Sequence, residues 1–590
     1  MKVNIGNNYI KKKIELERKD TICIIILICV FIVISIRSLF GFDWSDETYY
    51  PTSPYKLFLG GELFKDYWNV SQFGDILLMP YIYIYHLFSH NMDGIILFMR
   101  FIYNLFNLCI ALYLYNTFKN ICYNPLLIMA ASCIIIFAPF SVGTLSYNTY
   151  SLQLLLFSGI LISRYIYQKK RRLLVFSGTA YGLAVQMYPG LIFAIFVIPL
   201  YLFYNKDLYD LKESRVKRII LWLIGIGIVI LIFICYFFYN TSVQSAVENF
   251  HRLFESDKIG YENRNINGIQ SIINICFQYL SQIINIIGFN AYLIAIITLA
   301  IFVLSFCKKF EILIRIEKIL YIVLLLLTFS IFIKVFETGE INFINMPLAL
   351  IGPLLWCING RESNVCNLIY ILGIFESLAI QIGSNNGIIG SAYGLFLSSI
   401  AVMIYISIVV HKKNKDFNIR SVSSKDLIIK YTNIIICIVL TSSMLYFRID
   451  NVYRDQKIPD LNARLETGPG KGIYTTQLSK EKYEEICEEI RMYIPEDGTI
   501  LFSRLLPFGY LMSDLQPATP TTFSAEISSP SLEEYYQVYS EMIPTCVFVI
   551  DKNVGIDNDN NPIEGYLGAV LLSGQYDIIK LKYSTVYLKK

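Results

Sequence analysis

Residues 41–50 read Gly-Phe-Asp-Trp-Ser-Asp-Glu-Thr-Tyr-Tyr and directly follow the first apolar segment, Thr21 to Phe40. The stretch places two adjacent carboxylates, Asp46 and Glu47, at the point where a helix would leave the membrane. Charged groups are costly in hydrocarbon, so the pair marks the end of a membrane span. It is either a solvated flank of that span or the centre of a site at the membrane surface.

The whole chain is far more apolar than a soluble protein of its size. Its 590 residues are 55% hydrophobic and 16% charged, with a mean hydropathy of +0.51. These values indicate a polytopic membrane protein. A basic stretch from Lys11 to Lys19 precedes the first apolar segment, and no small-residue cleavage site follows that segment. The pattern predicts a retained span with a cytoplasmic amino terminus.

Apolar runs long enough to cross the hydrocarbon core, which takes about 20 residues, predict thirteen spans. After the first, they are expected at 94–116, 122–141, 150–167, 173–188, 190–204, 218–239, 289–307, 319–335, 344–358, 366–384, 390–410 and 429–447. The break between the spans at 173–188 and 190–204 is assigned to Pro189-Gly190. In this arrangement the basic clusters fall on the amino-terminal side of the membrane, as the positive-inside rule requires.

Two further apolar stretches are not expected to span. Residues 77–88 are rich in aromatic side chains, and residues 269–287 are interrupted by Gln and Ser. Both are predicted to be helices in the outer interface, where Tyr and polar side chains can reach headgroups. Residues 1–447 are therefore the expected transmembrane domain.

Residues 448–590 form a polar tail of opposite charge. They hold 14 Lys and Arg against 21 Asp and Glu, a net charge of −7, and since the whole chain is +4 the membrane part carries +11. Helix-like segments at 480–493 and 531–542 and strand-like segments at 499–503, 546–551 and 577–581 predict a small extracytoplasmic α/β domain. Cys487 and Cys546 of this tail form either a disulfide or, as the favoured reading, two buried thiols.

The residues around the acidic pair carry a resemblance to a known family. A first span, an outer loop that opens with Asp46-Glu47-x-x-Tyr50, juxtamembrane helices and a second span bearing Arg100 resemble the GT-C superfamily of integral-membrane glycosyltransferases. The relatives of protein O-mannosyltransferases and aminoarabinose transferases are the most similar group, over residues 1–447. The resemblance implies transfer of a sugar from a polyprenyl-phosphate carrier to an acceptor hydroxyl on the outer face, with inversion.

The same resemblance implies roles for three residues. Asp46 is the expected general base that takes the proton of the acceptor hydroxyl, and Glu47 is expected to position Asp46 or the acceptor. Arg100 lies a short way into the second span, where an ionised group needs a partner. We expect it to contact the acidic pair or the carrier phosphate; snorkelling outward to headgroups is the alternative.

Further residues are expected to bind the donor or the acceptor. A phosphate leaving group needs cationic partners, and Arg252 and Lys334 are the candidates besides Arg100. Tyr50 and Gln72 are expected to bind the sugar or the acceptor.

Asn148 is also expected to bind the sugar or the acceptor. It stands where many members of the family carry a second acidic residue. A neutral amide supplies little to a divalent cation. We therefore predict no cofactor and no metal ligand, with a divalent cation left open.

The leading hypothesis is a polyprenyl-phosphate-sugar-dependent hexosyl- or pentosyltransferase, multi-pass in the cell membrane. Its expected partners are the lipid-linked donor, a glycan, lipid or protein acceptor and the bilayer. A transporter or flippase, or a polymerase or ligase, for lipid-linked saccharides is the alternative. Transporters tend to carry ionisable residues at the bilayer midplane in repeated halves, whereas here such residues crowd the outer rim. No nucleotide-binding loop is found, and nucleic acid is not an expected partner.

Overall fold

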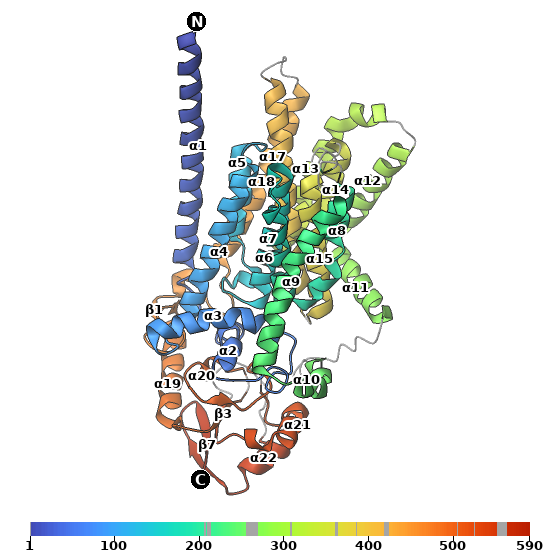
Figure 1. Ribbon diagram of the computed structural model, residues 1–590. Coiled ribbons are helices and arrows are strands. Elements are labelled where there is room, and N and C mark those ends of the chain that lie inside the picture. The colour runs from blue at the N-terminus through green and yellow to red at the C-terminus, as the bar shows by residue number, and fades with distance from the viewer. Residues whose placement is uncertain are drawn as a thin grey trace.

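A bundle of long helices with a small mixed domain at one end forms the molecule (Figure 1). The computed structural model describes residues 2–205, 208, 214–254, 269–306, 310–359, 364–384, 386–417, 424–503, 505–523, 525–550 and 563–590. The bundle helices are α1 (Lys2–Arg37), α4 (Ile95–Phe118), α5 (Asn124–Ile136), α6 (Tyr147–Gln168), α7 (Arg172–Met187), α8 (Val197–Tyr204), α9 (Arg215–Asn240), α12 (Phe289–Phe306), α13 (Phe310–Thr338), α14 (Met346–Asn359), α15 (Asn364–Gly383), α17 (Phe396–Phe417) and α18 (Ser424–Asp450).

Further helices lie between the bundle helices along the chain. They are α2 (Asp46–Phe58), α3 (Gln72–Ser89), α10 (Val243–Asn249), α11 (Ile269–Ile287) and α16 (Gly387–Ser391), with the 3₁₀ turns η1 (Pro139–Ser141), η2 (Pro189–Ala194), η4 (Phe250–Phe254), η6 (Ile341–Asn345) and η7 (Ala392–Leu395). The predicted break at Pro189 is confirmed, because α7 ends just before it and a 3₁₀ turn begins there. The predicted interfacial segments are also helical: α3 lies across the bundle in Figure 1, and α11 meets α12 at an angle of 108°.

The multi-pass helical class is confirmed, whereas the predicted count of spans stays a prediction. Each expected span coincides with a helix or a pair of helices. Within the described residues, six helices are long and apolar enough to cross a membrane, or seven if the bent pair α11 and α12 is one span. Shorter apolar helices such as Asn124–Ile136 lie among them.

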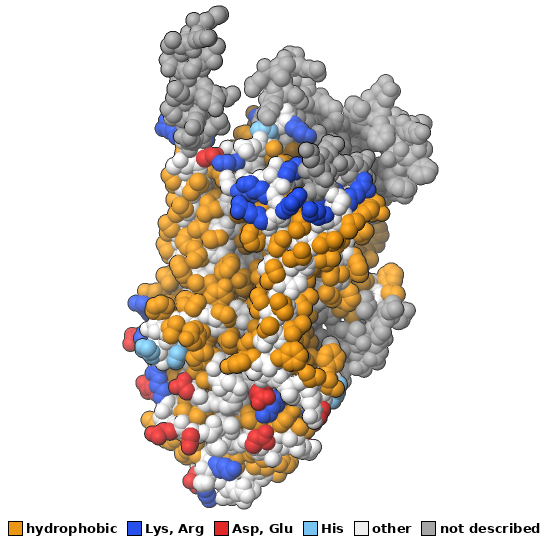
Figure 2. Space-filling view, viewed as in Figure 1, with side chains coloured by type: hydrophobic (Ala, Val, Ile, Leu, Met, Phe, Trp, Pro, Cys, Tyr) orange, Lys and Arg blue, Asp and Glu red, His pale blue; other side chains and the backbone are white. Residues whose placement is uncertain are grey.

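Charge is distributed unevenly along the bundle axis. Figure 2 shows a belt of hydrophobic side chains around the helices, with Lys and Arg gathered beyond it at the end where the amino terminus lies. At the opposite end, over the tail, Asp and Glu are mixed with Lys and Arg. The expected orientation, in which the basic end is cytoplasmic, stays a prediction.

The residues after α18 form a compact mixed domain, which we call the tail domain. Its five-stranded sheet has the order β4-β3-β5-β7-β6, with β3 parallel to β4 and β5 and with β7 antiparallel to β5 and β6. The strands are β3 (Thr499–Phe502), β4 (Gln516–Pro517), β5 (Cys546–Ile550), β6 (Tyr576–Lys580) and β7 (Ser584–Lys589), and a separate pair is β1 (Ala463–Arg464) with β2 (Tyr474–Thr475). The helices are α19 (Gln477–Tyr493), α20 (Pro507–Tyr510), α21 (Pro530–Val538) and α22 (Gly565–Leu571). The predicted α/β class is confirmed, and Cys487 and Cys546 are buried free thiols.

Helix α2 is held by the tail domain. Pro51 and Pro54 lie inside it and remove backbone donors, so the helix depends on contacts from outside. Thr52 Oγ1 donates to the carbonyl of Pro507 at 3.1 Å, and the Tyr55 hydroxyl donates to Asp514 at 2.8 Å. The fully buried Lys56 donates to the carbonyl of Thr519. The helix that begins with the acidic pair is thus fixed from the tail side.

The chain entering the acidic stretch is anchored to the same domain by its backbone. Gly41 N donates to the carbonyl of Tyr474 at 2.8 Å, and Tyr474 N donates to the carbonyl of Leu39 at 2.8 Å. These two hydrogen bonds form a short parallel bridge between Phe40, just after α1, and Tyr474 of β2. Trp68, from the loop before α3, is fully buried in the core of the tail domain. The bundle and the tail domain therefore share an interior.

Helices α7 and α9 pack at very short range, and two glycines allow it. A Cβ atom on Gly178 would lie 1.9 Å from the carbonyl oxygen of Trp222, and one on Gly225 would lie 2.1 Å from that of Val175. Small residues at helix crossings let backbones approach in this way. We predict that Gly225→Ala forces the helices apart at a cost of about 1–3 kcal/mol, seen as a lower melting temperature of the purified protein.

Gly227 is the matched control on the same helix. A Cβ atom there would meet nothing within 4 Å, so Gly227→Ala should leave the melting temperature unchanged or raise it slightly, since Ala favours helix. Equal melting temperatures for the two variants would contradict the role of the crossing.

Candidate functional site

The acidic stretch turns sharply from α1 into α2, and Asp43 closes the turn. Its carboxylate accepts hydrogen bonds from Ser45 N at 3.3 Å, Ser45 Oγ at 3.0 Å and Glu47 N at 3.0 Å. The free N–H groups of a first helical turn favour such a carboxylate. Asp46 and Glu47 therefore begin α2 on a capped and rigid turn.

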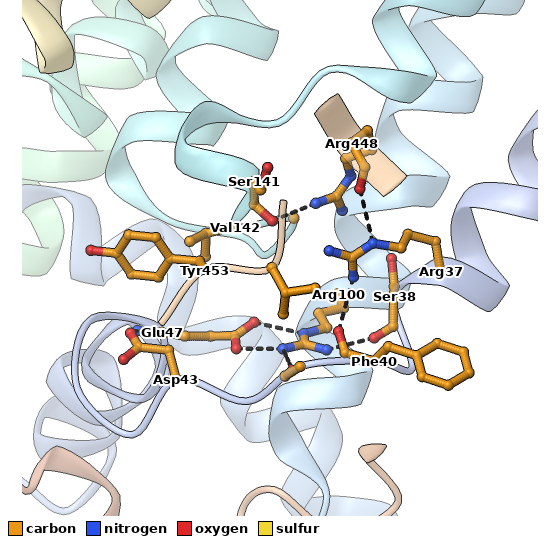
Figure 3. A pocket seen from close by; sticks show the side chains of 13 residues that line it. Arg37, Ser38, Phe40, Asp43, Glu47, Arg100, Ser141, Val142, Arg448 and Tyr453 are labelled. Atoms are coloured by element: carbon orange, nitrogen blue, oxygen red, sulfur yellow. Dashed lines mark hydrogen bonds and ion pairs between the residues drawn. The ribbon is translucent and has the colours of Figure 1, made fainter. Parts of the chain in front are cut away.

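Glu47 forms a buried two-point ion pair with Arg100 of α4, as Figure 3 shows. Arg100 Nε lies 2.6 Å from Glu47 Oε1 and Arg100 Nη2 lies 2.5 Å from Oε2. The Glu47 side chain is 3% exposed and the Arg100 side chain is 9% exposed. A guanidinium and a carboxylate bind best in this parallel, planar arrangement. The expected contact between Arg100 and the acidic pair is thus present, and it is made to Glu47.

Arg100 also holds the end of α1. Its Nη1 donates to the carbonyl of Ser38 at 2.6 Å and its Nη2 donates to that of Gly41 at 2.7 Å. These carbonyls lie at and just beyond the carboxyl end of the helix, where a positive charge is favoured. One side chain therefore connects the second long helix, the end of the first and the start of α2.

Two more buried arginines lie against the same turn (Figure 3). Arg37 donates to the carbonyls of Arg448 and Asn451 at the end of α18, both at 2.9 Å. Arg448 donates to the carbonyl of Ser141. Ser141 adopts a left-handed backbone with φ 62°, a conformation that few residues other than glycine adopt. The ends of α1 and α18 are thereby joined to the loop before α6.

A cavity of about 20 Å³ lies between these groups, enough for about one water molecule. Its lining includes three guanidinium groups, two carboxylates and two aromatic residues, which belong to Arg37, Arg100, Arg448, Asp43, Glu47, Phe40 and Tyr453. Among the described residues, Arg448 Nε and Ser141 Oγ are buried there without a hydrogen-bond partner. The wall formed by the arginines is rich in donors.

Asp46 differs from Glu47 in remaining accessible. Its side chain is 22% exposed, against 3% for Glu47. The hydroxyl of Tyr453 donates to Asp46 Oδ2, and Arg454 Nη2 lies 3.3 Å from the same oxygen. A carboxylate offers about four lone-pair sites, so Asp46 keeps acceptor capacity beyond these contacts.

The environment of Asp43 disfavours its charged form. Burial, and then the neighbouring charge of Asp46, raise the pKa of Asp43 to about 6. The hydrogen bond from Glu47 N and the charge of Arg454 act in the opposite direction but do not cancel the effect. Asp43 therefore loses its proton at a higher pH than an ordinary aspartate does.

Tyr50 and Asn148 lie in a group of aromatic residues from several elements. Tyr50 is one helical turn after Asp46 and packs edge-on against Tyr147, at 5.8 Å between ring centroids. Asn148 follows Tyr147 at the start of α6, and its Oδ1 accepts a hydrogen bond from the Tyr393 hydroxyl at 2.8 Å. Two of the expected sugar- or acceptor-binding residues thus stand near each other and near Asp46.

The other expected binding residues lie elsewhere. Gln72 is fully buried, accepting from Phe64 N at 2.9 Å and donating to the carbonyl of Asn69, so its amide is used within the loop before α3. Arg252 of η4 pairs with Glu534 of the tail domain at 2.9 Å and covers the ring of Trp68. Lys334 of α13 pairs with Glu337 at 2.9 Å and is half exposed. Neither cation lines the cavity beside Glu47.

Five residues beside the pair were not expected from the sequence. They are Arg37, Asp43, Arg448, Tyr453 and Arg454. Arg37 and Arg448 carried a usable signal, because both stand at the predicted outer end of a span, where basic residues are not favoured. Lys258 and Arg264, which the loop after α9 also offers, lie outside the described residues. Within the part of the chain that the structure describes, no three His, Cys, Asp or Glu side chains group closely enough to hold a metal ion.

Comparison with solved structures finds proteins similar to this chain. No family model matches the chain, and no curated protein matches it. The chain is similar to the archaeal oligosaccharyltransferase AglB from Archaeoglobus fulgidus, solved in complex with an inhibitory peptide and a dolichol-phosphate. The two share 14% identical residues over 89% of this chain and 69% of that chain, with a TM-score of 0.43.

The buried pair yields a stability prediction. Arg100→Met leaves the Glu47 carboxylate buried without its partner, at a cost of about 3–5 kcal/mol, and should lower the melting temperature strongly. Adding Glu47→Gln removes the uncompensated charge, so the double variant should recover part of the loss. The measurement is a double-mutant cycle of melting temperatures in detergent.

The exposed pair of Lys334 and Glu337 provides the control for this cycle. Because exposed ion pairs contribute about 0–1 kcal/mol, Lys334→Met should hardly change the melting temperature. Effects of Arg100→Met and Glu47→Gln that simply add in the double variant would show that the pair is not energetically coupled.

The raised pKa of Asp43 yields a prediction about pH. Its folded-state pKa of about 6 lies above the unfolded value near 4, so folding favours the protonated form. This residue's contribution to stability is therefore greatest below about pH 4, declines as the pH rises to about 6 and is constant above that. Asp43→Asn, which can still cap α2, should remove this decline from melting curves recorded across that range.

The difference between the melting temperatures of wild type and Asp43→Asn at each pH isolates the effect of Asp43 from that of other titrating groups. Asp577→Asn, at an exposed carboxylate of β6, should leave the pH profile of wild type unchanged. Parallel profiles for wild type and Asp43→Asn would contradict the raised pKa.

Proposed function

We propose that the protein is an inverting glycosyltransferase that moves a sugar from a polyprenyl-phosphate-linked donor to an acceptor hydroxyl. The supporting observation is the division of work between neighbouring carboxylates: Glu47 is buried and neutralised by Arg100, while Asp46 is accessible. They stand where the helical bundle meets the tail domain. A donor with its chain in lipid and its sugar in water requires a catalyst at such a boundary.

Asp46 acts as the general base in this proposal. It takes the proton of the acceptor hydroxyl while the acceptor oxygen attacks the anomeric carbon from the side opposite the departing phosphate. The bond from sugar to phosphate oxygen breaks, and the configuration inverts. As positive charge develops on the sugar, the attacking hydroxyl becomes more acidic, which a weak carboxylate base can exploit.

Glu47 and Arg100 position the base. The ion pair fixes the first turn of α2, and with it the direction of the Asp46 side chain. A base displaced by about 1 Å loses much of its effect, so a rigid start of the helix serves the reaction directly.

The departing phosphate needs positive charge nearby. The sequence suggested Arg100, Arg252 and Lys334 for this task, but Arg252 and Lys334 are held in other ion pairs. The cavity wall instead contains Arg37 and Arg448 beside Arg100. We therefore assign the stabilisation of the leaving group to the positive charge of this wall, which acts from beside the phosphate because the cavity itself has room for about one water molecule.

The sugar is assigned to the aromatic group around Tyr50 and Asn148. Small-ligand sites are mostly apolar and aromatic with a few directed polar groups, which is the composition found here. The proposal leaves the identities of the sugar and of the acceptor, whether glycan, lipid or protein, to experiment.

Reconstitution with a radiolabelled polyprenyl-phosphate sugar and membrane extract as the acceptor tests the proposal. The wild-type protein should release carrier phosphate and label an acceptor. Asp46→Asn keeps the shape of the side chain but cannot take a proton, so turnover should fall by about 100-fold or more.

Asp450→Asn is the matched control, since Asp450 is a carboxylate of the same junction that pairs with Lys457. It should retain turnover. Full activity of Asp46→Asn would remove the assigned base. Movement of intact donor between leaflets without release of phosphate would favour a flippase instead.

A further inference from the structure

Arg454 connects two carboxylates of the acidic stretch. Its Nη2 lies 3.3 Å from Asp46 Oδ2, and its Nη1 lies 3.8 Å from Asp43 Oδ1. The same Nη1 donates to Ser45 Oγ, between the two acids in sequence. The guanidinium thus lies over the turn that begins α2.

The three carboxylates of the stretch are divided between two guanidiniums. Arg100 binds Glu47 at two points from the bundle side. Arg454 contacts Asp43 and Asp46, and it comes from the link, by which we mean the first residues of the tail domain after α18. Without this second cation, the like charges of Asp43 and Asp46 would face each other beside a buried wall.

The backbone places Arg454 in this position. Its φ of 51° is in the left-handed region, which costs a residue with a side chain and persists where the surroundings demand it. The preceding residue, Tyr453, donates to Asp46, and the Arg454 guanidinium lies 5.1 Å from the centre of the Tyr453 ring. Two consecutive residues of the link therefore act on the same carboxylate.

An ordinary role in stability does not account for this contact. The Arg454 side chain is 47% exposed, and ion pairs that are so open contribute little to folding. The contact does, however, place one guanidinium between an oxygen of the partly exposed Asp46 and an oxygen of the buried Asp43. Carboxylate oxygens that converge in this way attract Mg²⁺ or Mn²⁺, which often bind through one or two carboxylates and several waters.

We propose that Arg454 is the built-in counter-ion of the acidic site: it occupies the place between Asp43 and Asp46 where a divalent cation would otherwise bind, and it makes the site independent of metal. A guanidinium remains charged at any physiological pH and cannot dissociate from the chain. The role of Arg454 in sugar transfer, which is to hold the Asp46 side chain in one orientation, rests on the proposed function. Its exclusion of a metal ion does not rest on that function.

The proposal is tested by measuring how tightly the full-length protein in nanodiscs binds Mn²⁺. The concentration of free Mn²⁺ is followed by electron paramagnetic resonance. Arg454→Ala and Arg454→Gln remove the charge, and each should bind one Mn²⁺ at least about tenfold more tightly than wild type. The Gln variant keeps much of the side-chain volume and serves if the Ala variant is unstable. Arg454→Lys retains a cation and should behave as wild type.

A double variant locates the bound ion. Asp43→Asn together with Arg454→Gln should lose the gained Mn²⁺ binding, because one of the two carboxylates is neutral. Wild type that binds Mn²⁺ as tightly as Arg454→Gln would overturn the proposal. The proposal would also be overturned if Arg454→Ala and Arg454→Gln, with melting temperatures that show them to be folded, bound Mn²⁺ no more tightly than wild type.

Transfer assays extend the test. Turnover of wild type should be insensitive to EDTA. Turnover of Arg454→Gln should be lower than that of wild type, and added Mn²⁺ should restore part of it. Arg454→Lys, which keeps a cation, should also have more activity than Arg454→Gln. Absence of transfer by wild type with every donor would refute the proposed function alone, since the Mn²⁺ measurement still decides the role of Arg454.

Discussion

The buried ion pair of Glu47 and Arg100 is the constraint on which the candidate site depends. Two charges removed from water near the end of a membrane helix are tolerated only when they satisfy each other and their remaining donors find partners. Arg100 meets this condition by binding the carbonyls of Ser38 and Gly41 as well. The turn between α1 and α2 therefore has one arrangement, and Asp46 is placed by it.

Much of this could be predicted because the signals are local. Apolar runs of membrane length and the basic clusters between them predicted the helical bundle, and short apolar runs predicted β3, β5 and β6. The cost of a charge inside a span predicted that Arg100 has a partner. The acidic pair was found because its position after the first span is itself a local pattern.

The remaining site residues could not be predicted, because their meaning comes from contacts between distant segments. Arg37 and Arg448 are far apart in the chain and meet because the ends of α1 and α18 lie together. Arg252 was expected at the site from its charge and loop, yet Trp68 and Glu534 determine where it lies. Strand β7 escaped prediction because it is identified by its antiparallel partners, β5 and β6.

The contacts of α2 with the tail domain affect how this protein could be recombined with others. Thr52, Tyr55 and Lys56 reach into the tail domain, while Glu47, at the start of the same helix, is bound by the bundle. A chimaera joined after α18 would separate these halves of one support, although the junction lies in a natural place along the chain. Exchange of the tail between proteins should succeed only when α2 travels with it.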